Sequence, residues 1–231
     1  MDSIIEVVRC FENSNIIHVD GVINPTNDIE IIELELIYAD LETVSKRRER
    51  LKKQLKADKS LIKEDLVLEK IEKALNEGKS ARSLELTEEE KDIIKSLSLL
   101  TLKPLMYVAN VDEKTIQDIE KNENFKKVKQ YAESQNAKVI PICVKLEEEI
   151  SSIESEDERK EFLEMMGLDK SGLDKLIIAS YDILGLMSYL TVRRNRSKSM
   201  DYKKRDKSTK SGIKDTFRYR KRVYKSGNRI I

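Results

Sequence analysis

Hydrophobic and polar positions alternate with a helical period over much of the first third of the chain. From Ile29 to Leu55 apolar residues recur mostly every three or four positions, and Lys, Arg and Glu fill the places between them. This spacing is typical of an amphipathic α-helix. Ala57–Ser60 breaks the pattern, and Leu61–Leu75 predicts a second amphipathic helix that ends at Gly78, a residue type favoured after helix C-termini. Two charged helices with a short connection predict an antiparallel hairpin or coiled coil.

Three short apolar runs predict buried strands. They are rich in β-branched residues and are bounded by polar or turn-forming residues, and they cover Ser3–Val8, Pro104–Ala109 and Ala137–Val144. Helical patterns follow the second and third runs, at Asn122–Ser134, Glu147–Met166 and Gly172–Leu186. Thr87–Glu90 has the form of a capping box and predicts a further helix start. The alternation of strands and helices predicts an α/β domain with a parallel sheet, interrupted by the helical hairpin.

Charge divides the chain into two parts. Of its 231 residues 38% are charged, against about a quarter in ordinary domains, and the formal net charge is only +1. From Arg193 onward there are 16 Lys and Arg against 3 Asp, whereas residues 1–192 carry 28 bases against 40 acids. We therefore expect a disordered or irregular basic tail at 193–231, able to bind nucleic acid without specificity through its charge.

Cysteine usage and hydropathy point to the cytoplasm. Cys10 and Cys143 are the only two cysteines and lie far apart in the sequence, so they form neither a disulfide framework nor a metal cluster. No apolar run reaches the length of a membrane span, and Met1–Ser3 does not begin a signal peptide. We expect a cytoplasmic protein with no membrane partner and no metal ligands of its own.

Polar residues follow two of the predicted strands, where open α/β sheets bind their ligands. Asn110 ends one apolar strand, and its amide offers both a donor and an acceptor to the edge of a planar base. The main chain of Val111 could add to this contact, and the strand end at Cys143 and Val144 could cover the other side of the base. The alternative is that Asn110 only begins a turn, which on spacing alone is the more common case.

Two further motifs are weak on spacing alone. His18 is the only histidine and could orient or deprotonate a water molecule, although a histidine without a chemical role is the more common case in a loop. Gly78-Lys79-Ser80 matches the end of a phosphate loop, G-x-x-x-x-G-K-[ST]. The first glycine of that motif is replaced by Lys73, and the preceding segment is a charged helix. We therefore reject it.

A set of short segments follows one another along the chain in the order, and with the loop lengths, of a known family. They are Val8–Asn13, Ile16–Val19, Asn24–Pro25, Asp28–Glu30, Ala39–Thr43, Ala81–Leu84, Lys103–Pro104, Tyr107–Val111 and Gly167–Leu168. Together they resemble the YchF (Obg-like) ATPases, and the resemblance runs from Asp2 to about Val192. It implies a partial P-loop GTPase-type parallel sheet with helices and an inserted coiled-coil hairpin. The implied domains are 1–35 and 98–192 for the nucleotide-binding domain, 36–97 for the insertion and 193–231 for the tail.

The resemblance also implies a function. YchF proteins hydrolyse ATP in preference to GTP with Mg²⁺ and associate with ribosomes. The stretch from Asn110 to Glu113 is the N-x-x-E form that accompanies adenine in this family, in place of the N-K-x-D that reads guanine. The family's proposed catalytic histidine corresponds to His18. The implied nucleotide-binding residues are Asn110, Val111, Glu113, Cys143 and Val144.

The chain departs from the family at its N-terminal side. In YchF proteins the phosphate loop, both switch regions and the magnesium ligands precede the equivalent of Met1. Without them the main electrostatic contribution to phosphoryl transfer is missing, so we expect binding of the adenine end of ATP without turnover. We also expect the strands at Ser3–Val8 and Leu105–Ala109 to expose unpaired edges that promote aggregation.

The basic tail has a possible origin in a frameshift. YchF proteins continue with a TGS domain whose opening reads like A-W-T-I-K-K-G-T-K-A-P. Suitable codons for Met200–Ser211, read one nucleotide later, give W-T-I-K-K-G-T-K-A-P-K, and Asp215–Ser226 can yield I-H-S-D-I-E-R-G-F-I-R-A. We hypothesise that the chain is frameshifted after about residue 192. Two alternative functions stay open at this point, a basic-tailed coiled-coil module that binds ribosomes or RNA, and a non-functional remnant.

Overall fold

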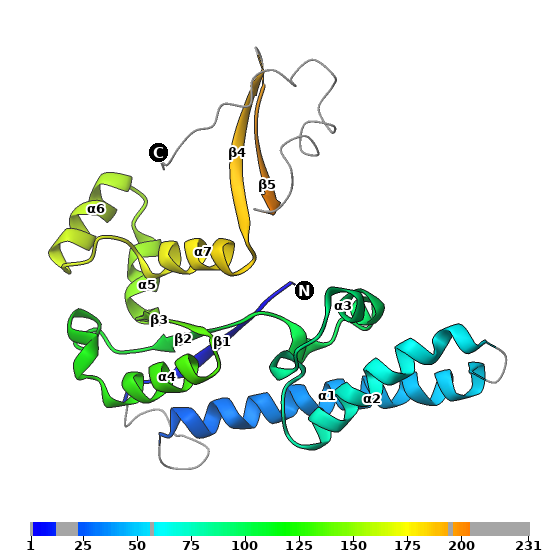
Figure 1. Ribbon diagram of the computed structural model, residues 1–231. Coiled ribbons are helices and arrows are strands. Elements are labelled where there is room, and N and C mark those ends of the chain that lie inside the picture. Colours follow the sequence, from blue (N-terminus) through cyan, green and yellow to red (C-terminus); the bar gives the residue numbers. More distant parts are fainter. Residues whose placement is uncertain (1, 13–22, 56–57, 194–195, 204–231) are drawn as a thin grey trace. The chain divides into compact units, whose positions relative to one another are not determined.

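The computed structural model describes residues 2–12, 23–55, 58–193 and 196–203. It divides into two compact units, Met1–Lys175 and Leu176–Ile231, which are considered separately (Figure 1). The strands are β1 (Ile4–Arg9), β2 (Leu105–Asn110), β3 (Lys138–Ile142), β4 (Leu186–Arg193) and β5 (Arg196–Lys203). The α-helices are α1 (Pro25–Gln54), α2 (Ile62–Asn76), α3 (Glu88–Ile94), α4 (Glu123–Ser134), α5 (Val144–Ser152), α6 (Glu156–Met165) and α7 (Gly172–Ile183). Short 3-10 helices are η1 (Lys59–Leu61), η2 (Ala81–Ser83), η3 (Lys95–Leu97), η4 (Leu100–Leu102) and η5 (Ile116–Lys121).

A parallel three-stranded sheet in the order β1-β2-β3 forms the centre of the first unit. This confirms the predicted mixed α/β class with a parallel sheet. β2 is the middle strand, and Leu105 to Ala109 are all buried because a strand flanks each side and helices pack against the sheet. The expectation that Leu105–Ala109 would expose an unpaired edge is therefore wrong. β1 pairs on one side only among the described residues, and Ile5 and Val7 are 40% and 63% exposed.

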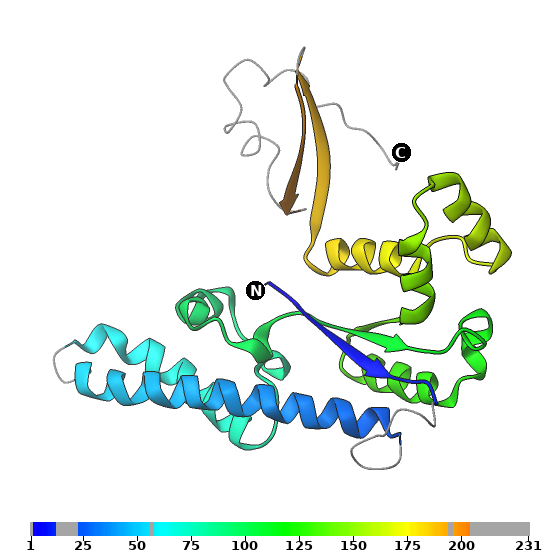
Figure 2. The same ribbon diagram turned by 180° about the vertical axis from the view of Figure 1, so that it is seen from behind.

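Helices α1 and α2 lie antiparallel and side by side in both views (Figure 1, Figure 2). Pro25 occupies the first turn of α1, where its missing N–H costs nothing, so the helix begins before the Ile29 of the apolar pattern. The seam between the two helices buries Ile37, Val44, Leu51, Leu68 and Ile71. Charged pairs flank it, with Arg47 Nε 2.6 Å from Glu64 Oε1 and Arg48 Nε 3.2 Å from Asp65 Oδ1. The description of this pair as a coiled coil stays a prediction, as does the division of the chain into four segments.

Capping residues set several helix ends. Glu90 N donates to Thr87 Oγ1 at 3.2 Å and Thr87 N donates to Glu90 Oε2 at 2.7 Å, which confirms the predicted capping box at the start of α3. The single helix predicted over Glu147–Met166 is wrong, because α5 ends at Ser152 and α6 begins at Glu156. Ser155 accepts from Glu158 N at 3.5 Å and so caps a new helix instead of continuing the old one. Within the part of the chain that the structure describes, no helix combines the length and apolar character that crossing a membrane requires.

The second unit contains an antiparallel hairpin of β4 and β5. Leu186 is in register with Lys203, and Arg193 with Arg196. The expectation of a disordered or irregular tail from residue 193 is therefore wrong for 196–203. The β-branched and aromatic residues of 186–193 favour an extended backbone, against which the segment 196–203 pairs. Residues 204–231, with most of the proposed frameshifted region, lie outside the described residues.

Candidate nucleotide-base site at the strand ends

Three loops meet at the carboxyl ends of the parallel strands. Asn110 ends β2, and its carbonyl accepts a hydrogen bond from Cys10 N, just beyond β1, at 2.8 Å. On the other side Val111 N donates to Ile142 O, the last residue of β3, at 2.9 Å. Val144 N donates to the Asn110 side-chain oxygen Oδ1 at 3.3 Å. The two strand ends expected to surround a base are thus joined directly.

The same contacts define what each residue has left to offer a ligand. Asn110 Oδ1 has a second lone pair beyond the one used by Val144 N, and Nδ2 carries two N–H donors. The amide of Val111 is committed to β3, so the Val111 carbonyl is the main-chain group that could contact a base. The side chain of Val144 is 49% exposed and could lie against the flat face of a ring.

Glu113 forms an ion pair that the sequence analysis did not predict. Lys145 Nζ lies 2.7 Å from Glu113 Oε1 and 4.0 Å from Glu149 Oε1. The hydrogen bond with Glu113 raises the pKa of Lys145. The pair is exposed and contributes little to stability, but it holds one carboxylate oxygen in place. The only sequence signal was the position of Lys145 immediately after the strand end.

Cys143 is buried at the end of the loop that follows β3. Its side chain is 3% exposed, and it directly precedes the first turn of α5. Burial raises the pKa of the Cys143 thiol, while hydrogen bonds from the backbone of Leu146 and Lys145 oppose that shift. The thiol therefore stays protonated at neutral pH and packs with Leu146 and Ile150 in a small hydrophobic cluster.

Two polar side chains that were not predicted shape the loops around Asn110. Asp112 Oδ1 accepts from Lys114 N at 3.0 Å and from Thr115 N at 2.9 Å, which forms the turn after β2. Asn122 Nδ2 donates to Cys10 O at 3.0 Å and thereby ties the start of α4 to the end of β1. Asx turns of this type have a sequence signal, an Asp or Asn before a short polar run.

The segment Gly78-Lys79-Ser80 does not contribute to this site. Gly78 has a φ of +73° just after α2, and Lys79 pairs with Glu77 at 2.9 Å, so Gly78-Lys79-Ser80 is a helix terminus. His18 lies outside the described residues. Within the described ranges no group of three His, Cys, Asp or Glu side chains could hold a metal ion, and no catalytic step is assigned to one.

Curated relatives match most of the chain. Proteins named ribosome-binding ATPase YchF from Bacillus subtilis (strain 168) and Escherichia coli O157:H7 are 47% and 43% identical to it over 205 and 191 residues. These matches cover 88% and 82% of this chain but 56% and 52% of the relatives. The chain therefore spans about half the length of the curated relatives it matches. A search against models of known protein families found no match.

A solved structure shows the same fold. The YchF GTPase of Schizosaccharomyces pombe superposes with a TM-score of 0.80 at 32% sequence identity. The match covers 93% of this chain and 58% of that chain. Sequence identity and backbone likeness thus extend over nearly all of the residues present. Over the part that it spans, the chain belongs to the YchF family.

Proposed function

We propose that the site at Asn110 binds the adenine ring of ATP, and that these residues form the base-recognition part of a ribosome-binding ATPase of the YchF type. The observation that carries the proposal is the hydrogen bond from Val144 N to Asn110 Oδ1 at 3.3 Å, because it brings the two strand ends into one site. The relatives' names, which describe ribosome-binding ATPases, support the same assignment.

The chemistry of the site suits adenine. Adenine presents an acceptor, N7, beside a donor, the N6 amino group, and an asparagine amide can pair with both. In Asn110 the Nδ2 donor would meet N7, and the second lone pair of Oδ1 would accept from N6. Guanine recognition needs a free carboxylate for two neighbouring N–H groups, and Glu113 already pairs with Lys145 at 2.7 Å. This supports a preference for ATP over GTP.

These 231 residues alone should bind the base without hydrolysing the nucleotide. The sequence contains no G-x-x-x-x-G-K-[ST] stretch, and the nearest approach to one is the helix terminus at Gly78. Hydrolysis requires backbone amides and a lysine that stabilise the charge on the transferred phosphoryl group. We therefore assign recognition of the adenine ring to the described residues. The role of His18, which lies outside them, as the family's catalytic histidine stays part of the proposal.

Titration of the chain with adenosine, ADP and ATP tests the adenine assignment. We expect the three dissociation constants to agree within about threefold, because the phosphates gain no specific contact. Asn110→Asp keeps an oxygen for Val144 N but removes the Nδ2 donor, and should weaken adenosine binding by about 3- to 10-fold. Asn76→Ala, at the exposed end of α2, is the matched control and should bind as the parent does. Equal affinity of the Asp variant, or hydrolysis of ATP by the purified chain, would show the assignment to be wrong.

Attachment to ribosomes is proposed from the relatives' names and would place the protein in the cytoplasm. Non-specific binding of nucleic acid by the basic tail would produce a similar result at low salt only. Pelleting with ribosomes at about 50 and 300 mM salt separates the two, because a purely electrostatic attachment weakens by orders of magnitude over that range. Retention at the higher salt supports specific attachment, and complete loss contradicts it.

A further inference from the structure

Five polar side chains from five elements meet on the helix-covered face of the sheet. Glu6 of β1 and Tyr107 of β2 are partners in the parallel register, so their side chains share this face. Tyr131 of α4 donates from its hydroxyl to Glu33 Oε2 of α1 at 2.9 Å, and its ring packs edge-on against Tyr107 with centroids 6.2 Å apart. Arg82 of η2 completes the group. The cluster therefore connects the sheet to the N-terminal part of α1 and to η2, the segment that follows α2.

Arg82 is the only cation among these five residues, and not all of its N–H groups have a hydrogen-bond partner. Its Nη2 lies 3.9 Å from Glu33 Oε1, and Nη1 donates to Lys103 O, just before β2, at 3.3 Å. Within the described part of the chain, Nη2 and the hydroxyl of Tyr107 are buried without a hydrogen-bond partner. Buried polar groups without partners are rare and destabilising, so the guanidinium of Arg82 is held here with only part of its hydrogen-bonding capacity satisfied.

Glu6 is the group whose charge can change near neutrality. Burial, and next the neighbouring carboxylate of Glu33, raise the pKa of Glu6 to about 7; Asp28 adds to the shift and Arg82 opposes it. These are the charged groups that face Glu6 from α1 and η2. From β2 it meets Tyr107, and Tyr131 of α4 lies next to Tyr107; both phenols stay neutral because burial raises their pKa.

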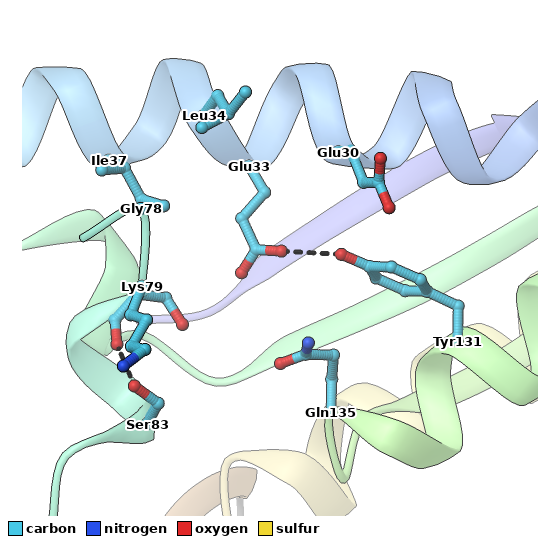
Figure 3. Close-up of a pocket in the computed structure, with 10 residues that line it drawn as sticks. Glu30, Glu33, Leu34, Ile37, Gly78, Lys79, Ser83, Tyr131 and Gln135 are labelled. Carbon is cyan, nitrogen blue, oxygen red and sulfur yellow. Dashed lines mark hydrogen bonds between the residues drawn. The ribbon is translucent and has the colours of Figure 1, made fainter. Parts of the chain in front are cut away.

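A cavity of about 380 Å³ gives this cluster access to solvent (Figure 3). Glu33 and Tyr131 line it, with their hydrogen bond crossing it, and Gln135 lies on the same side as Tyr131. Ser80 from the segment before η2 also lines the cavity. Glu6 does not line the cavity, but its side chain is only half-buried, so a proton can reach both carboxylates without unfolding of the sheet.

We propose that Glu6, Glu33 and Arg82 form a proton-controlled clamp between the sheet and the helical pair α1–α2. With a proton on Glu6, the positive charge of Arg82 offsets the negative charge of Glu33, and the N-terminal part of α1 packs firmly on the sheet. When Glu6 loses the proton to water, two carboxylates share one guanidinium, and the repulsion between them loosens α1 and η2 from β1. The clamp does not rest on nucleotide binding.

The stability of the whole chain tests the linkage. Because the pKa of Glu6 is higher in the folded state than its ordinary value of 4.5, the folded state binds more protons between pH 4.5 and about 7. The stabilisation is complete below that window and is lost as the pH rises through it. Glu6→Gln stays neutral throughout. From pH 5 to pH 8 we expect the unfolding equilibrium constant of the parent to rise by about tenfold relative to Glu6→Gln, after allowance for partial solvent screening.

A matched control removes a carboxylate charge from the same region of the fold. Glu30 is exposed on α1 and lines the cavity, but it is not among the groups that shift the pKa of Glu6. Glu30→Gln should keep the parent's pH dependence. Parallel pH profiles for the parent and Glu6→Gln would overturn the proposal, and so would an equal flattening in Glu30→Gln, which would indicate a general charge effect.

Hydrogen exchange measured by mass spectrometry tests the location of the change. After correction for intrinsic rates, protection of α1 peptides around residues 26–40 should fall between pH 6 and pH 8 in the parent and stay constant in Glu6→Gln. Peptides from α5 and α6 should not distinguish the two proteins. Uniform changes across all peptides, or no change at α1, would overturn a clamp at this position.

Discussion

Asp40, buried in the middle of α1, accepts hydrogen bonds from the backbone amide of Thr101 at 2.7 Å and from its hydroxyl at 2.6 Å. The two residues are 61 positions apart. The other oxygen of Asp40 accepts from Leu100 N at 2.8 Å, and the Thr101 hydroxyl oxygen accepts from Ala81 N at 3.2 Å. One carboxylate thus fixes the entry to β2 and, through Thr101, the segment that returns from α2.

Asp40→Asn should destabilise the fold by about 1–3 kcal/mol. The amide keeps one acceptor oxygen but places an NH₂ group against a buried donor, which loses its partner. The free energy of unfolding in urea measures the effect. Asp92→Asn, exposed on α3, is the control and should lie within about 0.5 kcal/mol of the parent. An Asp40→Asn variant as stable as the parent would contradict the role given to this carboxylate.

Gly172→Ala should cost about 1–3 kcal/mol because no space exists for a methyl group at the start of α7. An added Cβ would lie 2.9 Å from both Glu147 Oε1 and Ile142 Cγ2. Glu147 cannot easily move away, since it accepts from Gly172 N at 2.6 Å and Leu173 N at 3.0 Å. Thermal unfolding gives the measurement. Gly167→Asn serves as the comparison, because Gly167 has open space and a φ of +70° that asparagine tolerates.

Both cysteines should resist alkylation in the native state. Burial raises the pKa of Cys10 to about 12 and also raises that of Cys143, so the thiolate fraction at pH 8 is very small. Iodoacetamide should react more than about a hundredfold more slowly than with the chain in 6 M guanidinium. The variant Cys143→Ser assigns any residual reaction to one thiol. Rapid modification of one equivalent at pH 8 would show that one of the two sites opens readily.

Val7→Lys should reduce self-association with little loss of stability. Val7 is 63% exposed on β1, whose outer side has no partner strand in the described ranges, and a charge on such an edge opposes pairing with another chain. Sedimentation velocity over a concentration series would detect the change. Met165→Lys, 72% exposed on α6, introduces the same charge away from the edge. If both variants reduce association equally, net charge and not the edge is responsible.

Local patterns predicted some elements of the fold, whereas the break between α5 and α6 and the hairpin of β4 and β5 were missed. The apolar period from Ile29 to Leu55 predicted most of α1, and the apolar runs predicted β1, β2 and β3, because these patterns are local. The break between α5 and α6 was missed because the cap at Ser155 is weaker in sequence than the helical period around it. The hairpin of β4 and β5 was missed because the positive charge of the tail outweighed its strand-forming residues.

For the candidate site, the sequence indicated Asn110, Val111, Glu113, Cys143 and Val144, whose nucleotide-binding role stays a prediction. It did not indicate Lys145 as the partner of Glu113, because the pairing depends on how two separate loops meet. His18 lies outside the described residues, so its catalytic role also stays a prediction.

By itself the amino-acid sequence determined the three strands of the parallel sheet, most of the helices α1 and α2, the family, and the polar residues at the strand ends. Each of these follows from a spacing of three or four residues, from a short apolar run, or from a short motif. Only the tertiary structure decided which polar groups are buried together. Asp40 with Thr101, and Glu6 with Glu33 and Arg82, meet across long stretches of chain. Their energies and pKa values depend on burial and on the distances between charges, which no local pattern encodes.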